Sequence, residues 1–294
     1  MIRIVFSYLS WPLLLAVCIG FTQLGMMNGH GVLTFNAVYL SLAVTLFFLE
    51  RAMPHEANWL RNDGQILPDL SHTLLNKGLV QVLVVTATAM GAAETLAPEG
   101  GGIWPREWPL AVQVIVGLVV AEFGLYWAHR LAHEIPYLWR FHAVHHSVKR
   151  LWFFNTGRFH FVDTALSIVL SQPLLFLAGA PKEVFIWVSG ITAFIGILTH
   201  CNIEMRFGFL NYIFNTPGLH RWHHSMDLRE GNKNYGENLM LWDLLFGTYF
   251  DAPRRPPAVI GIHDHMPESF AGQLIQPFSP RIPPSDATAE RTKA

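Results

Sequence analysis

The chain has 294 residues, of which 51% are hydrophobic and only 14% are charged. A soluble domain usually carries about 25% charged residues, so this composition indicates a membrane protein. The net charge of −1 excludes a strongly basic chain, and we expect no nucleic-acid partner. Two cysteines, Cys18 and Cys201, are too few for a disulfide scaffold or a thiolate metal site.

Long apolar segments follow one another from the N-terminus. A transmembrane helix needs roughly 20 mostly apolar residues to cross a hydrocarbon core of ~30 Å. No small-residue cleavage site closes the first segment, so we expect it to be a retained span rather than a signal peptide. The predicted spans are residues 5–27, 32–49, 77–96 and 109–128.

Two shorter apolar segments, 162–179 and 184–200, predict a helical hairpin that either spans the bilayer or dips into it. The expected fold is therefore all-α, a polytopic membrane bundle of about four spans plus this hairpin, with a histidine-rich helical cap. We predict transmembrane helices over 1–108, a catalytic region over 109–251 and a flexible, proline-rich tail over 252–294. The tail offers little apolar surface to bury.

Basic residues lie mainly on one side of this topology. They follow the second and fourth spans and the hairpin, as at Arg51, Arg140 and Arg206, whereas the opposite loops hold few. By the positive-inside rule, both termini and all the histidine motifs are expected on the cytoplasmic face. The lack of a KDEL-type retention signal favours a bacterial inner membrane.

The histidines are concentrated in one third of the chain. Ten of the fifteen lie between His129 and His224, as one HxxxH motif, two HxxHH motifs and two single residues, His160 and His200. Residues three and four positions apart share a helix face, so each motif presents its imidazoles together. Neutral imidazole binds iron, zinc and copper, and eight motif histidines exceed what one ion can hold. The motif histidines are His129, His133, His142, His145, His146, His220, His223 and His224.

This pattern predicts a site for two metal ions. A basic surface for lipid headgroups is the alternative, but lysine and arginine would serve it better, because histidine is mostly neutral at pH 7. Ligand type alone leaves iron and zinc open. His72 could line the site, although an ordinary interfacial position is favoured.

Acidic and amide side chains near the motifs are candidates to orient the imidazole N–H groups. Glu122 precedes His129 by seven residues on the same helix face, and an ionisable residue at that depth is functional by default. The candidates are Glu122, Asp163, Asn202, Asn234 and Asp243.

From about Val119 to Phe250, the order and spacing of motifs resemble the fatty acid hydroxylase/sterol desaturase superfamily. The matching segments are Tyr126-Trp-Ala-His129-Arg-Leu-Ala-His133, Trp139-Arg-Phe-His142-Ala-Val-His145-His146-Ser147, Arg158-Phe-His160, His200-Cys-Asn202, Thr216-Pro-Gly-Leu-His220-Arg-Trp-His223-His224, Asn234-Tyr-Gly-Glu-Asn238 and Trp242-Asp-Leu-Leu-Phe-Gly-Thr248. The family commonly has Pro-x-Glu after the single histidine at His160, whereas this chain has Phe161-Val-Asp163.

The resemblance implies an O2-dependent enzyme that hydroxylates or desaturates a lipid at a histidine-bound di-iron centre on the cytosolic face. Zinc can displace the iron. Electrons would come from NAD(P)H through a separate redox partner. All eight motif histidines would be ligands, together with His160 and His200.

Several alternatives stay open on the sequence. A zinc-dependent membrane hydrolase would use metal-activated water, and a haem-binding or metal-handling membrane protein would use the histidines without oxygenase chemistry. Sterol, hopanoid, fatty acyl, ether lipid and carotenoid substrates all fit, and the oligomeric state is open. The spans are expected to shape an apolar cavity lined by Phe123, Phe153, Phe154 and Phe194.

Overall fold

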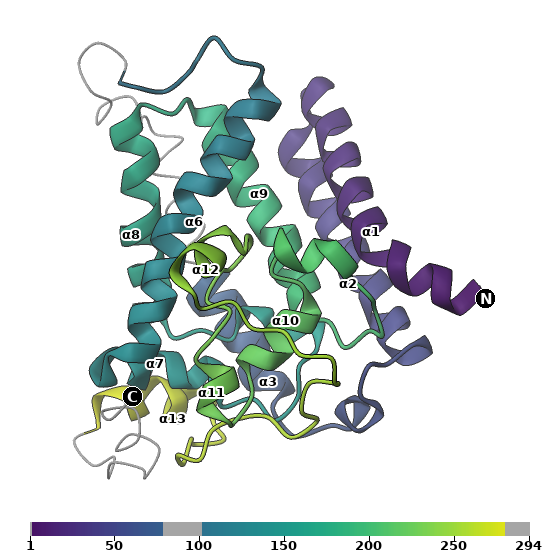
Figure 1. Cartoon of the computed structure of the whole chain (residues 1–294), viewed down its shortest axis with the longest axis vertical. Helices are drawn as coiled ribbons and strands as arrows, with labels where there is room; N and C mark the ends of the chain where they lie inside the picture. The colour runs from purple at the N-terminus through teal and green to yellow at the C-terminus, as the bar shows by residue number, and fades with distance from the viewer. Residues whose placement is uncertain (1, 79–101, 280–294) are drawn as a thin grey trace.

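The computed structural model describes residues 2–78 and 102–279. This part of the chain is helical and also contains three isolated β-bridges. Five of its helices are long and apolar enough to cross a membrane (Figure 1). They are α1 (Ile2–Met27), α2 (Gly31–Ala52), α6 (Leu110–Glu134), α8 (Phe161–Ala178) and α9 (Lys182–Thr199).

The polytopic membrane bundle expected from the sequence is confirmed. Helices α1, α2 and α6 cover three of the four predicted spans, while most of 77–96 lies outside the described residues. The predicted hairpin is formed by α8 and α9, each of 18 residues. At 1.5 Å per residue, each of these helices is about 27 Å long, close to the thickness of a bilayer core.

Helix α6 is the central element, because α7, α8, α9 and α12 all pack against it. Helix α6 can approach α8 closely because residue 124 is glycine. A Cβ added at Gly124 would lie 2.1 Å from the carbonyl oxygen of Leu170. Gly117 similarly leaves room for the side chains of Val184 and Val188 of α9, which an added Cβ would contact too closely. Small residues of this kind let membrane helices approach closely.

Shorter helices form a cap that covers the end of the bundle where α6 reaches Glu134, at the bottom of Figure 1, and that extends along α6 as far as α12. Two of them begin with proline at the first turn, where the missing N–H costs nothing. The cap helices are η1 (Ala57–Leu60), α3 (Ile66–Ser71), η2 (His72–Gly78), α7 (Pro136–His146), η4 (Phe153–Gly157), η5 (Gly208–Tyr212), α10 (Pro217–His223), α11 (Leu228–Gly231), α12 (Leu241–Phe246), α13 (Phe270–Ile275) and η6 (Gln276–Phe278).

Residues 252–279, the first part of the predicted tail, make contacts with the cap. Ile260 is buried with Trp59, whose indole nitrogen donates to the carbonyl of Ala258 at 2.9 Å. Gln273 of α13 is fully buried and bonds His72. A few well-placed anchors therefore hold this proline-rich segment to the cap, although its apolar content is low. The remaining tail residues, 280–294, lie outside the described chain.

Candidate metal centre

Four helices, α6, α7, α9 and α10, bring the histidines together. His129 and His133 lie one turn apart near the end of α6, and the first HxxHH motif ends α7. The second HxxHH motif occupies α10, where Thr216 caps the first turn by accepting from the backbone N–H of Leu219. His200 terminates α9.

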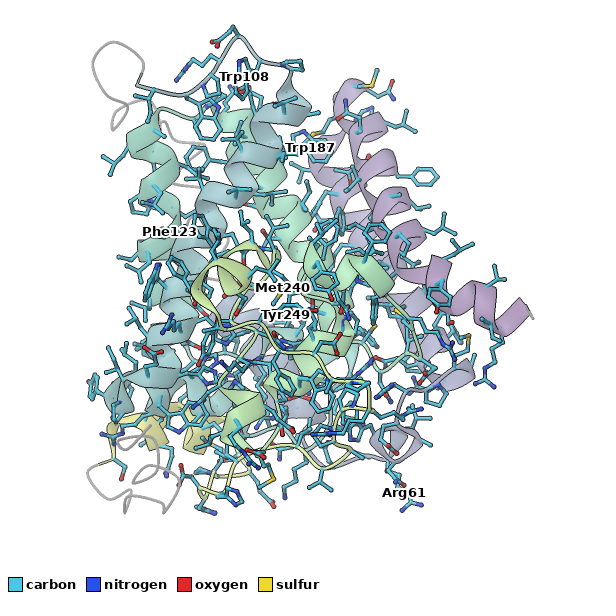
Figure 2. All side chains as sticks on the ribbon, viewed as in Figure 1. Arg61, Trp108, Phe123, Trp187, Met240 and Tyr249 are labelled. Atoms are coloured by element: carbon cyan, nitrogen blue, oxygen red, sulfur yellow. The ribbon has the colours of Figure 1, made fainter. Side chains whose placement is uncertain are left out.

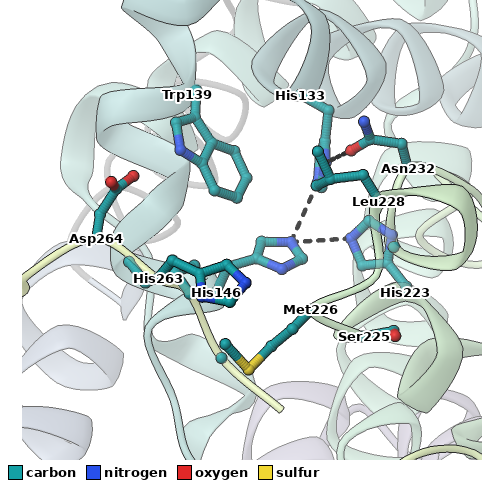
Figure 3. A pocket seen from close by; sticks show the side chains of 13 residues that line it. His133, Trp139, His146, His223, Ser225, Met226, Leu228, Asn232, His263 and Asp264 are labelled. Atoms are coloured by element: carbon teal, nitrogen blue, oxygen red, sulfur yellow. Dashed lines mark hydrogen bonds between the residues drawn. The ribbon is translucent and has the colours of Figure 1, made fainter. Parts of the chain in front are cut away.

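Nine of the ten predicted histidine ligands gather into two adjoining groups. In the five-histidine group the ligand nitrogens all lie within 4.8 Å of one another, and its members are His129, His133, His142, His146 and His223. The Nε2 atom of His146 lies 3.1 Å from that of His133 and 3.0 Å from that of His223 (Figure 3).

The second cluster is the four-histidine group, whose ligand nitrogens also lie within 4.8 Å of one another. Its members are His145, His200, His220 and His224. Its Nε2 atoms also converge, with 2.8 Å between His220 and His200 and 3.0 Å between His224 and His220. The ring of His146 stacks on that of His224 at a centroid distance of 4.4 Å, which places the two groups side by side.

All nine histidines are buried. Burial lowers the pKa of His145, His146, His220, His223 and His224 well below the ordinary value of 6.5, and the neighbouring imidazoles lower it further. These five rings are therefore neutral at pH 7, which is the form that binds a metal.

The hydrogen bonds around the groups fit metal ligation. The Nδ1 atoms of His129 and His223 each lie 2.7 Å from a backbone oxygen, that of Tyr235 and that of Lys233 respectively. A carbonyl oxygen only accepts, so each Nδ1 carries the proton and each Nε2 presents a lone pair to the group. The Nε2 atoms of His129 and His142 are buried without a hydrogen-bond partner. A bound cation would satisfy these inward lone pairs.

Side-chain acceptors orient three further rings from outside. His142 Nδ1 donates to the carboxylate of Asp163 at 2.8 Å. His133 Nδ1 lies 3.1 Å from Asn232 Oδ1, and His200 Nδ1 lies 2.9 Å from Asn155 Oδ1. Sequence reasoning missed both asparagines, and no spacing to a histidine marks either one.

Glu122 and Asp243 act on the backbone rather than on an imidazole. Glu122 accepts from the backbone and side-chain amides of Asn238, at 3.0 and 2.8 Å. Asp243 accepts from the N–H groups of Tyr235 and Gly236, at 2.8 and 2.7 Å. Together they fix the loop whose Tyr235 carbonyl receives the Nδ1 proton of His129.

The predicted asparagines have separate positions. Asn234 adopts a left-handed backbone with φ of 56° and bonds Phe250 through its side chain, so it shapes the same loop. Asn202 instead bonds the backbone N–H and carbonyl of Glu56 at 2.9 and 3.0 Å, which ties the end of α9 to the segment after α2.

His160 is the one predicted ligand that lies in neither group. Its Nδ1 accepts the N–H of Val162 at the start of α8, and its Nε2 lies 3.2 Å from the carbonyl of Leu274. Both ring nitrogens are thus used in helix capping and in holding the C-terminal segment. The structure therefore does not bring His160 together with the other predicted ligands.

His72 also lies outside both groups, but it is connected to one of them. Its Nε2 bonds Gln273 at 2.9 Å, and Asn76 bonds both His72 Nδ1 and the carbonyl of Phe159. The ring of Phe159 stacks on His145 at 4.1 Å. His72 thus supports the wall of the four-histidine group.

The four phenylalanines expected to line a cavity each pack against another aromatic ring. Phe123 contacts Trp242, Phe194 contacts Phe35, and Phe153 and Phe154 flank Trp152. The described chain has a pocket beside the five-histidine group, which reaches His133, His146 and His223 (Figure 3). Its outer wall includes Trp139, Met226, Leu228, Asn232, His263 and Asp264.

The fold and site define a polytopic membrane protein with a buried centre of nine imidazoles, suited to two metal ions. The chain belongs to the fatty acid hydroxylase family, whose sequence profile matches residues 114–248. It is 51% identical to the ornithine lipid hydroxylase OlsE of Rhizobium tropici over 278 residues, which is 93% of this chain and 84% of that protein.

More distant relatives match about half of the chain. The alkylglycerol monooxygenase of Xenopus tropicalis is 30% identical over 48% of this chain and 31% of its own length. The fatty acid hydroxylase vlmA of a Lecanicillium species is 30% identical over 51% of this chain and 45% of its own. No solved structure matches. This membership makes the protein a membrane oxidoreductase that acts on a lipid.

Proposed function

We propose that the protein is an O2-dependent di-iron hydroxylase of ornithine lipid or a closely similar aminoacyl lipid. The proposed substrate rests on the 51% identity to OlsE over 93% of the chain. The hydroxylase and monooxygenase names of the relatives favour hydroxylation over desaturation. The catalytic region would be 109–251, in keeping with the family match over 114–248.

The five-histidine and four-histidine groups would each hold one iron, and zinc could occupy the same nitrogens. When bound, the irons supply the activation of O2. The chain's own part is to present neutral imidazoles in fixed tautomers, through Asp163, Asn155 and the backbone carbonyls of Tyr235 and Lys233.

Hydroxylation of a C–H bond by O2 inserts one oxygen atom and releases the other as water, with two electrons and two protons consumed. We propose that the electrons come from NAD(P)H through a separate redox protein. The basic residues beside the cap, such as Arg140 and Arg206, support a cytoplasmic position for the centre. A bacterial inner membrane would be its location.

Expression in a bacterium that makes ornithine lipid but does not hydroxylate it tests the substrate. Lipid mass spectrometry should show ornithine lipid heavier by one oxygen atom, and growth under isotope-labelled O2 should label that atom. The His145→Ala variant should give no product. A product heavier by one oxygen atom that forms without O2, or that takes this atom from water, would contradict the oxygenase. Lipid cleaved by the addition of water, with no O2 consumed, would favour a metal hydrolase.

The metal content of the purified, detergent-solubilised protein tests the cofactor. We expect near two irons per chain, and loss of both in a variant with His145 and His146 replaced by alanine, because these neighbours belong to different groups. Two zinc ions would support the site without the redox chemistry. A folded protein that binds no metal would overturn the proposal.

A further inference from the structure

An apolar surface lies on two short cap elements, outside the five spans. Helix α12 exposes Leu241, Leu244, Leu245 and Phe246, and η5 exposes Phe209 and Tyr212. We call these six side chains the apolar rim. A water-facing domain rarely leaves a continuous patch of large apolar side chains uncovered, so the rim indicates a nonaqueous neighbour.

Backbone contacts make the two parts of the rim one surface. The N–H of Met240, directly before α12, donates to the carbonyl of Ile213, directly after η5, at 3.0 Å. Phe214 and Leu239 form a β-bridge beside this bond. The ring of Tyr212, the last residue of η5, also stacks at 5.4 Å on that of Tyr249, which follows α12.

The depth of α12 follows from its contact with α6. The indole nitrogen of Trp242 donates to the carbonyl of Val119 at 3.1 Å, and its ring lies 4.8 Å from that of Phe123. Figure 1 likewise shows α12 beside the middle of α6, well above α7 and α13.

The position of Val119 along α6 gives the depth at which Trp242 meets this helix in the membrane. Helix α6 begins at Leu110, close to the exposed Trp108, a residue suited to the far interface (Figure 2). At 1.5 Å per residue, Val119 is about 14 Å beyond Leu110 and about 22 Å short of Glu134. In a hydrocarbon core of roughly 30 Å, Trp242 therefore meets α6 near the middle of the core.

We propose that the apolar rim is immersed among the acyl chains of the leaflet on the side of the histidine centre. The rim adjoins α6, because Trp242 of α12 packs on Phe123 of α6 and bonds the carbonyl of Val119. The backbone around α12 has internal hydrogen-bond partners at that depth. The N–H of Met240 donates to Ile213, and those of Thr248 and Tyr249 donate to the carbonyl of Asp243.

The immersed helix is joined directly to the metal centre. Asp243 of α12 accepts from the N–H of Tyr235, and the carbonyl of Tyr235 accepts the Nδ1 proton of His129. The bilayer thus supports the loop that orients one ligand of the five-histidine group. The rim would be immersed whichever lipid is oxidised and whichever metal is bound.

Single-cysteine spin labels in the full-length protein, reconstituted into phosphatidylcholine vesicles, test the immersion. Leu245 and Ile275 form a matched pair, because both are apolar and similarly exposed, at 63% and 67%, but only Leu245 lies on the rim. Cys18 and Cys201 are buried, and the unsubstituted protein gives their labelling background.

At Leu245→Cys we expect the spin label to collide more often with dissolved O2 than with a water-soluble chromium oxalate complex. At Ile275→Cys we expect the reverse. The ratio of the O2 collision rate to the chromium oxalate collision rate should differ several-fold between the two positions. Chromium oxalate access at Leu245→Cys equal to that at Ile275→Cys would overturn the proposal. Low access to both reagents would also overturn it, because that indicates cover by protein. Phe209→Cys provides a second rim position, and only variants with the parent's helical content and monodispersity are compared.

Discussion

At the scale of single residues, the carboxylate of Asp163 fixes an imidazole of the centre, because it accepts a hydrogen bond from Nδ1 of His142. In Asp163→Asn we expect about 10- to 100-fold weaker metal binding at the five-histidine group, because an amide acceptor makes the ring less basic. Competition with a chelator during iron loading measures this affinity.

The four-histidine group should keep its affinity in that variant, since the hydrogen bond of Asp163 goes to His142 of the other group. Asp227→Asn is a suitable control, because Asp227 caps α11 near the surface and bonds Arg229 instead of a histidine. Equal loss of both metals in Asp163→Asn would mean that the carboxylate maintains the fold rather than His142.

His160 and His200 are both single histidines between the motifs, yet the structure separates their roles. Asparagine can cap a helix, so His160→Asn should leave the metal content unchanged. His200→Asn should remove metal from the four-histidine group, because its Nε2 lies 2.8 Å from that of His220. Iron analysis of the two purified variants decides the ligand set, and loss of iron in His160→Asn would restore the prediction from sequence.

The grouped histidines were predictable because HxxxH and HxxHH spacings put imidazoles on one helix face before any tertiary contact forms. The partners of the rings depend on tertiary packing instead. Asn155 meets His200 across 45 residues, and Asn232 meets His133 across 99. Neither partner shares a helix with its histidine, so no local periodicity could reveal the pair.

At the scale of elements, the spans were predictable because a bilayer demands a fixed length of apolar residues. The C-terminal segment was not predictable in this way, since its order rests on a few anchors. Its main anchor is Gln273, whose side chain bonds His72, Gln65 and two backbone carbonyls.

Loss of that anchor gives an element-scale prediction. In Gln273→Leu, the buried Nε2–H of His72 loses its acceptor, which should cost about 1–3 kcal/mol and lower the thermal midpoint in detergent. Ile275→Leu, on the exposed face of the same helix, should leave the midpoint unchanged. An unaltered midpoint in Gln273→Leu would show that α13 contributes little to holding the cap.

At the scale of the whole molecule, the centre lies where membrane helices and cap meet. Helix α6 supplies the first two ligands from its membrane-exit turn, α9 supplies His200 at its end, and the cap supplies the rest. Neither layer alone could bury nine imidazoles. The metals would therefore join the membrane bundle to the cap, and their removal by a chelator should lower the thermal midpoint.

Acid should destabilise the metal-free protein for the same reason. His145, His146, His220, His223 and His224 have pKa values lowered by burial, so the folded protein keeps them neutral. Unfolded histidine has a pKa of about 6.5 and takes up a proton below it. The unfolded state thus binds more protons as the pH falls through about 6.5, and stability declines by up to about 1.4 kcal/mol per pH unit for each such proton.

Thermal midpoints of the metal-free protein in detergent should accordingly be level above about pH 7 and fall progressively between about pH 6.5 and pH 5. The variant His220→Asn, which removes one of these groups, should show a shallower fall, since one proton fewer is taken up on unfolding. A midpoint that rises on acidification would require the folded histidines to bind protons more tightly than the unfolded chain. Charged imidazoles would then repel one another inside the cap, which contradicts their burial and their mutual contacts of 3.2 Å or less between Nε2 atoms.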